Sequence, residues 1–385
     1  MHIWIELVFW ISLGIVTLVT LGYPVFLAVA APLMRRPWLI TDAEPFVSLI
    51  IAAHNEERTI GQKLDNVLAL DYPRDRLEII VASDGSTDLT DEICESFRDR
   101  GVLLRRFPRT GKTGMQNTVA RTARGEILVF SDANAMYQPD AIRMLVRNFS
   151  DPAVGCVCGQ LVYRVHREGA GNCERRYWNY EKFIKRRESE LSSLIGANGS
   201  IYAVRHADYV EIPNDLISDF VEPLTLVACG RRVVYEPEAI SVEDASTSYA
   251  DEFRRKVRIL TRSIQGLLHM RALLNPFVYG IFSFQLLMHK LMRYLVPVFL
   301  VTAAASLAAL AALGLYGILF LIVTIAAATA AITEPRAGVT RVNPLVRVCH
   351  ILRYYMMVNY ALVLAWFNIF RGKRVTLWTP ERKSA

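Results

Sequence analysis

The chain has 385 residues, of which 52% are hydrophobic and 21% are charged. This apolar content excludes intrinsic disorder. Lys and Arg outnumber Asp and Glu by 44 to 37. Many of the extra cations flank apolar runs, as cytoplasmic membrane flanks do, so we predict a lipid bilayer as partner and no nucleic acid.

The first predicted element is a transmembrane anchor over residues 1–36. Residues 7–34 carry no charge, and a transmembrane helix needs about 20 residues. No Lys or Arg precedes the run, whereas Arg35 and Arg36 follow it, which argues against a cleaved signal peptide. We therefore expect a retained anchor with the following chain in the cytoplasm.

Residues 45–270 alternate between short apolar runs and helically spaced apolar residues, which predicts an α/β domain with a mostly parallel sheet. One helix is expected after Thr59, with Gln62 completing a capping box. Another is expected from Phe220 to Cys229, ended by Gly230. The predicted strands are residues 47–53, 77–82, 102–107, 127–131 and 232–236.

Apolar segments return after residue 270. Residues 275–293 end in basic side chains, which is typical of an amphipathic helix in the cytoplasmic interface. Residues 294–333 carry no charge and divide at residues 314–317, which predicts a transmembrane hairpin. Residues 350–371 either span the membrane or lie in its interface. The charge rule favours the interface, because it keeps the basic tail, residues 372–385, inside.

Two polar clusters follow predicted strands of the α/β domain, where open α/β sheets bind ligands. SDGSTD (83–88) follows the second strand, and SDANAMY (131–137) follows the fourth. Asp132 and Asn134 are spaced to hold one divalent cation such as Mg²⁺ or Mn²⁺, although each cluster alone is also typical of a polar turn. Neither a dinucleotide fingerprint nor a complete Walker phosphate loop is present.

Eight polar and aromatic segments follow one another in order along the chain: AAHNEE (52–57), VASDGSTD (81–88), GKTGMQN (111–117), FSDANAMY (130–137), RRYWNYEKFIKRRES (175–189), LIGANGSIYAVR (194–205), ISDFVEPLTLVACGRRVVYEP (217–237) and EFRRKVRI (252–259). This ordered set of motifs, over residues 45–295, resembles the family 2 glycosyltransferases, in the membrane-integrated branch that contains cellulose, chitin and hyaluronan synthases.

The resemblance implies a glycosyltransferase type A domain with a Rossmann-like mixed sheet, and inverting transfer from a nucleotide-diphosphate sugar, usually a UDP-sugar. It implies Asp219 as the general base, although Asp219 and Glu222 also form a helix-capping pattern. Its implied metal ligands are Asp132 and Asn134. The implied donor-binding residues are Ala53, Glu56, Asp84, Lys112, Asp132, Arg255 and Arg258, and the implied acceptor-binding residues are Trp178, Asn198 and Gly199.

Two departures from the family pattern bear on function. Asn134 stands where the metal motif has a second acid, and Ile259 stands where processive synthases have a Trp that helps to hold the polymer. The missing Trp favours transfer of one sugar to a lipid-linked or glycolipid acceptor in the membrane. A processive polysaccharide synthase remains the alternative.

Overall fold

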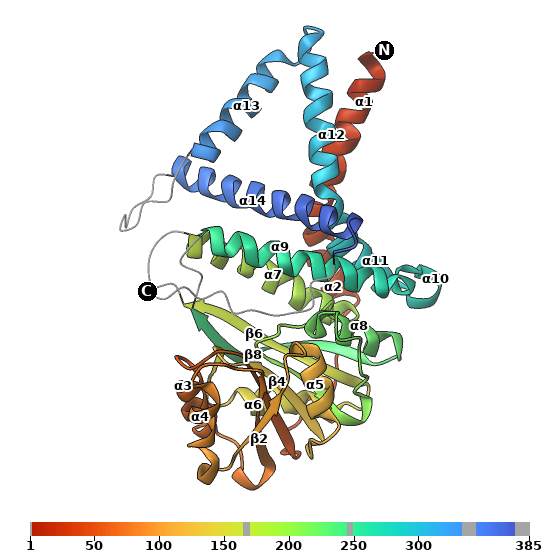
Figure 1. Ribbon diagram of the computed structural model, residues 1–385. Coiled ribbons are helices and arrows are strands. Elements are labelled where there is room, and N and C mark those ends of the chain that lie inside the picture. Colours follow the sequence, from red (N-terminus) through yellow and green to blue (C-terminus); the bar gives the residue numbers. More distant parts are fainter. Residues whose placement is uncertain (1, 165–169, 245–248, 333–343, 374–385) are drawn as a thin grey trace.

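The computed structural model describes residues 2–164, 170–244, 249–332 and 344–373. An α/β domain forms one end of the molecule, and long apolar helices project from the other (Figure 1). Helices α7 and α9 lie between these two parts.

The domain is built on a mixed eight-stranded sheet with the order β3-β2-β1-β4-β7-β6-β8-β5. The first four strands of that order are parallel, and β7 runs antiparallel to both β4 and β6. The strands are β1 (Val47–Ala53), β2 (Leu77–Asp84), β3 (Val102–Phe107), β4 (Ile127–Asp132), β5 (Met136–Tyr137), β6 (Val154–Arg164), β7 (Tyr202–Arg205) and β8 (Arg232–Asp244).

Fourteen α-helices cover the sheet and form the projecting part of the described chain. They are α1 (His2–Thr17), α2 (Tyr23–Leu33), α3 (Ile60–Leu68), α4 (Thr90–Glu95), α5 (Lys112–Ala120), α6 (Ala141–Val146), α7 (Ala170–Leu191), α8 (Ser218–Ala228), α9 (Tyr249–His269), α10 (Pro276–Tyr279), α11 (Ile281–Leu286), α12 (Arg293–Ala312), α13 (Gly317–Ile332) and α14 (Pro344–Phe370).

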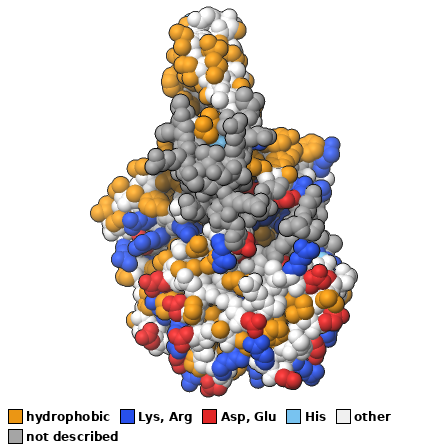
Figure 2. Space-filling model, turned by 90° about the vertical axis from the view of Figure 1, so that its left-hand side faces the viewer, with side chains coloured by type: hydrophobic (Ala, Val, Ile, Leu, Met, Phe, Trp, Pro, Cys, Tyr) orange, Lys and Arg blue, Asp and Glu red, His pale blue; other side chains and the backbone are white. Residues whose placement is uncertain are grey.

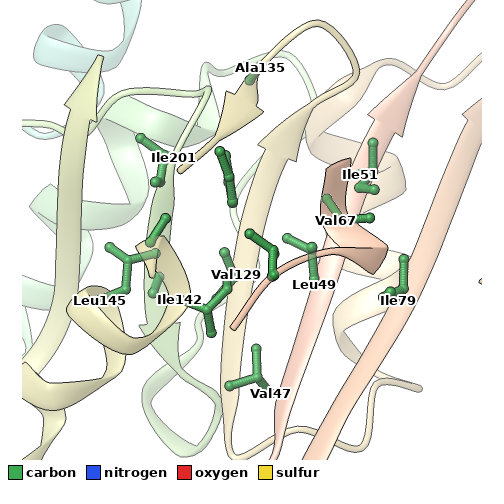
Figure 3. Packing of buried hydrophobic residues seen from close by; sticks show 14 of the residues in the cluster. Val47, Leu49, Ile51, Val67, Ile79, Val129, Ala135, Ile142, Leu145 and Ile201 are labelled. Carbon is green, nitrogen blue, oxygen red and sulfur yellow. The ribbon is translucent and has the colours of Figure 1, made fainter. Parts of the chain in front are cut away.

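The sheet is buried on both faces, which explains why its central strands are continuous apolar runs. Every residue of β1 is buried. Leu49 and Ile51 pack on the face that carries Val67 of α3 and Ile142 of α6 (Figure 3). The other face packs against α5 through Met115. The predicted strands are all present, but the sequence analysis missed β5, β6 and β7.

The expected capping box at α3 is wrong. Thr59 is the N-cap residue, but its side chain makes no capping hydrogen bond. The Thr59 hydroxyl instead donates to Glu56 Oε2 at 2.6 Å. The Thr59 hydroxyl therefore acts as a donor to a charged acceptor, and its oxygen accepts no backbone N–H of the first turn of α3.

Three helices of the described chain are long and apolar enough to cross a membrane: His2–Leu33, Ile281–Ala312 and Val348–Phe370. A fourth apolar helix, Gly317–Ala331, is shorter. Figure 2 shows hydrophobic side chains over the projecting tip and mixed charges over the α/β domain. The chain therefore has the surface of a membrane-associated protein.

The N-terminal helix is interrupted by a π-helical turn, Leu18–Gly22. Because Pro24 has no N–H, it cannot donate to the carbonyl oxygen of Thr20, four residues earlier. That oxygen instead accepts a hydrogen bond of 3.0 Å from the Tyr180 hydroxyl of α7. The helix irregularity thus allows a direct hydrogen bond between the N-terminal helix and α7.

A buried polar cluster strengthens this link. The Tyr23 hydroxyl of α2 donates to Glu188 Oε1 of α7 at 2.5 Å. The same oxygen lies 2.8 Å from His289 Nδ1, and Arg293 pairs with Glu181 of α7 at 2.6 Å. His289 belongs to a second π-helical turn, Leu287–Met292, which joins α11 to α12. The expected boundary between residues 293 and 294 therefore falls inside one continuous helix.

Helix α14 lies alongside α9 and crosses the foot of α12 (Figure 1). The rings of Phe253 and Tyr360 stack at 5.6 Å, and Trp366 Nε1 donates to the Tyr294 carbonyl at 2.9 Å. The C-terminal apolar helix is therefore packed on the α/β domain as well as on the projecting helices. Residues 374–385 of the predicted basic tail lie outside the described residues.

Candidate active site

The sequence motifs meet where parallel strands end. In the strand registers, Ala52 pairs with both Ala82 and Asp132, so Ala53, Asp84 and Asp132 lie at one edge of the sheet. Parallel strands present their carboxyl ends together, which is why residues distant in sequence converge there. Ala53 is fully buried and offers only its backbone to this edge.

Asp84 is fully buried and organises the loop that precedes α5. Its carboxylate accepts hydrogen bonds from Arg109 Nη1 at 2.8 Å, Thr110 N at 2.7 Å and Gly111 N at 3.0 Å. Gly111 has φ 84°, a conformation that a residue with a side chain rarely adopts. Asp84 thereby fixes the start of α5 and the position of Lys112, an arrangement that local sequence pattern does not reveal.

Glu56 lies beside this loop region and is also buried. Its backbone N–H donates to Thr90 Oγ1 at 2.8 Å, and its carboxylate accepts from Thr59. Thr90 begins α4, so Glu56 joins the end of β1 to the helix after β2.

Lys112 occupies the centre of the site. Its ammonium group pairs with the Asp132 carboxylate and donates to the Gly199 carbonyl oxygen at 3.2 Å. Burial lowers the pKa of Lys112, but the charges of Asp132 and Asp219 outweigh that effect and raise it, so the ammonium group stays protonated.

Asp219 lies in the first turn of α8, next to Gly199. Burial raises the pKa of its carboxyl group, Lys112 opposes the rise and Asp132 reinforces it. The capping interpretation of Asp219 is wrong, because the N-cap residue is Ile217 and no side-chain capping bond is present. A half-buried carboxylate with a raised pKa is suited to accept a proton as a general base.

The three residues predicted to bind the acceptor differ in how the structure places them. The Asn198 side chain is buried and holds the loop, donating to the Gly159 carbonyl at 2.9 Å and accepting from Lys185 of α7. Gly199 lies between Asp219 and Lys112. Trp178 belongs to α7, but its side chain lies outside the described residues.

Helix α9 carries Arg255, Arg258 and Arg262 at helical spacing. Arg255 pairs with Glu252 at 2.6 Å and also donates to the Tyr163 hydroxyl at 3.3 Å. Arg258 is half-buried one turn further along. Arg262, which sequence reasoning did not single out, is buried and attracted to Asp219.

Asp132 and Asn134 lie at the end of β4 and in the turn that follows. Asp132 keeps 23% of its side chain exposed and Asn134 is half-buried, so neither side chain of the predicted metal pair is closed off from solvent. Lys63 of α3, also missed from sequence, donates to the Ala135 carbonyl from beneath this turn. Burial lowers the pKa of Lys63 to about 7.

The described residues contain no group of three or more His, Cys, Asp or Glu side chains that could hold a metal. A single carboxylate with an amide nearby is still compatible with Mg²⁺ or Mn²⁺, because such ions retain waters and take further oxygens from substrate phosphates. The donor set therefore fits a metal that a diphosphate substrate helps to hold.

The family profile described as "Glycosyl transferase family 2" matches residues 48–212. Over 137 residues the chain is 35% identical to the beta-monoglucosyldiacylglycerol synthase of Synechocystis sp., covering 33% of this chain and 29% of that protein. It is 26% identical over 216 residues to the poly-beta-1,6-N-acetyl-D-glucosamine synthase of Staphylococcus aureus, covering 54% of this chain and 52% of that protein. The chain thus matches about half or less of these relatives' lengths.

A solved structure has a similar fold: the mannosyltransferase PcManGT from Pyrobaculum calidifontis in complex with GDP-Man and Mn²⁺. The TM-score is 0.73 at 23% identity, covering 95% of this chain and 100% of that one. The match confirms the predicted glycosyltransferase type A fold with its accompanying apolar helices. The structural likeness shows the fold, and the family profile identifies residues 48–212 with glycosyl transferase family 2.

Proposed function

We propose that the chain is an inverting glycosyltransferase that moves a sugar from a nucleotide-diphosphate donor to a lipid-linked or glycolipid acceptor at the membrane surface. The observation that carries this proposal is the convergence of Asp219, Lys112 and Asp132 around Gly199. The family match, and the names of relatives that make a glucolipid and an amino-sugar polymer, support it.

Asp219 is the proposed general base. An acceptor hydroxyl must lose its proton as its oxygen attacks the sugar carbon. The bond from that carbon to the diphosphate breaks on the opposite face, so the configuration inverts without a covalent enzyme intermediate. Gly199 leaves the Asp219 carboxylate in place, because a Cβ at this position would lie 2.7 Å from Oδ2 and would displace it.

The leaving diphosphate gains negative charge in the transition state, and fixed cations stabilise that charge. Lys112 is the first candidate, and Arg258 and Arg255 of α9 are the further candidates. Asp132 and Asn134 would hold Mg²⁺ or Mn²⁺, which supplies additional positive charge to the diphosphate when bound. Glu56 and Asp84 order the backbone on which the nucleoside would rest.

The acceptor is proposed to be membrane-held because the base helix contacts the apolar helices directly. Phe220, the residue after Asp219, packs in one buried cluster with Phe282 of α11 and Leu362 of α14. Ile259 of α9, which stands where processive synthases have a Trp, is exposed. A single transfer to a lipid headgroup is consistent with both features, and a processive synthase is the alternative.

The test uses the purified full chain in lipid vesicles with Mn²⁺. It is offered radiolabelled UDP-glucose, UDP-N-acetylglucosamine or GDP-mannose, together with a membrane lipid extract, and the products are analysed by mass spectrometry. Label on a lipid that carries one added sugar would support the proposal. A long polymer would favour the processive alternative, and the absence of product with every donor would refute the proposed activity.

A further inference from the structure

The carbonyl oxygen of Leu216 joins three parts of the candidate active site. Thr113 Oγ1 donates to it at 2.7 Å, and Arg262 Nη2 donates to it at 2.9 Å. Thr113 follows Lys112 at the start of α5, and Arg262 lies on α9 one turn beyond Arg258. Leu216 itself is three residues before Asp219. One buried acceptor therefore holds the donor-side helix, the arginine helix and the turn that carries the base.

Arg262 is unusual among the arginines of this region because only 7% of it is exposed and it forms no ion pair with a carboxylate within 4.0 Å in the described chain. Its Nε has no hydrogen-bond partner among the described residues. Burying a guanidinium without a carboxylate partner is costly, whereas a neutral side chain would fill the same space at less cost. The charge of Arg262 therefore needs an explanation other than packing.

Asp219 provides that explanation. Burial lowers the pKa of Arg262, and Asp219 is the leading charge that opposes this effect. Burial raises the pKa of Asp219, and Arg262 is among the cations that oppose the rise. Asp219 Oδ1 has no hydrogen-bond partner among the described residues. The two groups stabilise each other's charged forms without a direct bond.

We propose that Arg262 is a positioning residue: it fixes the turn from Leu216 to Asp219 and supplies a positive charge that favours the carboxylate form of the base. This inference rests on the proposed function of Asp219 and goes beyond it by naming what keeps the base ionised. The other charged or titratable groups that act on Asp219 are Lys112 of α5, Asp132 of β4, Lys185 of α7, Tyr202 of β7 and Cys158 of β6.

The test compares the dependence of kcat/KM on pH for the full chain in vesicles at saturating Mn²⁺. Arg262→Met removes the charge and one hydrogen bond to Leu216, whereas the matched control Thr113→Val removes the other hydrogen bond and no charge. For Arg262→Met, we expect the acid limb of the profile to move to higher pH by about one unit, because an opposite charge nearby typically lowers a carboxyl pKa by that amount or more. The acid limb of Thr113→Val should coincide with that of the wild type.

Arg262→Lys tests whether the positive charge alone restores the pH profile. It also serves as a second variant if Arg262→Met does not fold. It keeps the positive charge but loses the guanidinium fork, so its acid limb should stay near the wild-type position while kcat falls. Thermal unfolding and binding of UDP or GDP, measured by calorimetry, report whether each variant keeps its fold and its donor site.

An unmoved acid limb in folded Arg262→Met, or an equal shift in Thr113→Val, would overturn the inference while leaving the proposed glycosyl transfer standing. A shift of the acid limb of Arg262→Lys to higher pH, as large as that of Arg262→Met, would also overturn the inference. An absence of transfer by the wild type with every donor would overturn the proposed function and this inference with it.

Discussion

Gly199 lies against Asp219 with no room for a side chain. A Cβ atom added at Gly199 would lie 2.7 Å from Asp219 Oδ2 and 2.9 Å from Lys112 Nζ. A contact under 3.0 Å forces atoms to shift. The loop that precedes β7 is thus shaped around the proposed base, although Gly199 and Asp219 are 20 positions apart in the sequence.

Gly199→Ala should therefore displace the Asp219 carboxylate or the Lys112 ammonium group. We expect transfer to fall by about a hundredfold, the scale of a displacement of about 1 Å in a catalytic geometry. The measurement is kcat for sugar transfer, with thermal unfolding as a check on the fold. Gly61→Ala is the matched control, because a Cβ there meets only Ile93 at 3.6 Å and should leave kcat unchanged.

Asp219→Asn keeps the shape of the side chain and removes its ability to accept the acceptor proton. Since Asp219 is not the N-cap of α8, the substitution disturbs no capping bond. We expect folded protein that binds donor nucleotide, with transfer reduced by about a hundredfold or more. A folded variant with near-normal transfer would rule out Asp219 as the base and direct attention to Glu222 or Asp215.

Metal dependence should centre on Asp132. Asp132→Ala leaves Asn134 as the remaining oxygen ligand of the pair, so we expect transfer to be abolished and Mn²⁺-dependent nucleotide binding to weaken. Electron paramagnetic resonance of Mn²⁺ in the presence of UDP or GDP measures the binding directly. Asp99→Ala, at an exposed position, is the control. A rate that a chelator leaves unchanged would contradict the metal assignment.

Glu222 should make stability fall as pH rises. Burial raises the pKa of Glu222 well above its ordinary value of about 4.3, so the folded state holds this proton at a pH where the unfolded state has released it. The folded state then binds more protons than the unfolded state, and stability decreases with increasing pH above the unfolded pKa. Glu222→Gln keeps a neutral side chain throughout. Its Tm advantage over the wild type should grow between about pH 5 and pH 8; a constant difference would contradict this assignment.

The α/β domain is predicted to face the cytoplasm, because Arg35 and Arg36 follow the anchor and nucleotide sugars are cytoplasmic. Cys229 is an exposed native cysteine at the end of α8 and serves as the reporter. A membrane-impermeant maleimide should label it in inside-out vesicles and not in right-side-out vesicles. Cys229→Ser identifies the labelled site. Labelling from the outside would refute the proposed use of a nucleotide sugar.

Local pattern predicted the central strands because a strand buried on both faces is a continuous apolar run, as in β1 and β4. It missed β6 for the opposite reason. Gly155 and Gly159 interrupt the apolar residues of β6, and a glycine inside a strand usually destabilises that strand because it has no side chain to pack. In the folded chain, a Cβ at Gly159 would lie 2.7 Å from the Ala239 carbonyl oxygen. Gly159 thus allows the backbone of β8 to approach β6 closely, and this requirement becomes visible only when the two strands are paired.

The sequence by itself determined the family, the order of the motifs and the identity of Lys112, Asp132 and Asp219 as candidates, because each motif is a short run of residues. The tertiary structure alone decided which side chains meet. Asp84 holds the loop before α5, and Arg262 reaches the turn before Asp219, through hydrogen bonds that join residues more than 20 positions apart. Burial and charge at such contacts depend on how the elements pack, and no local pattern encodes them.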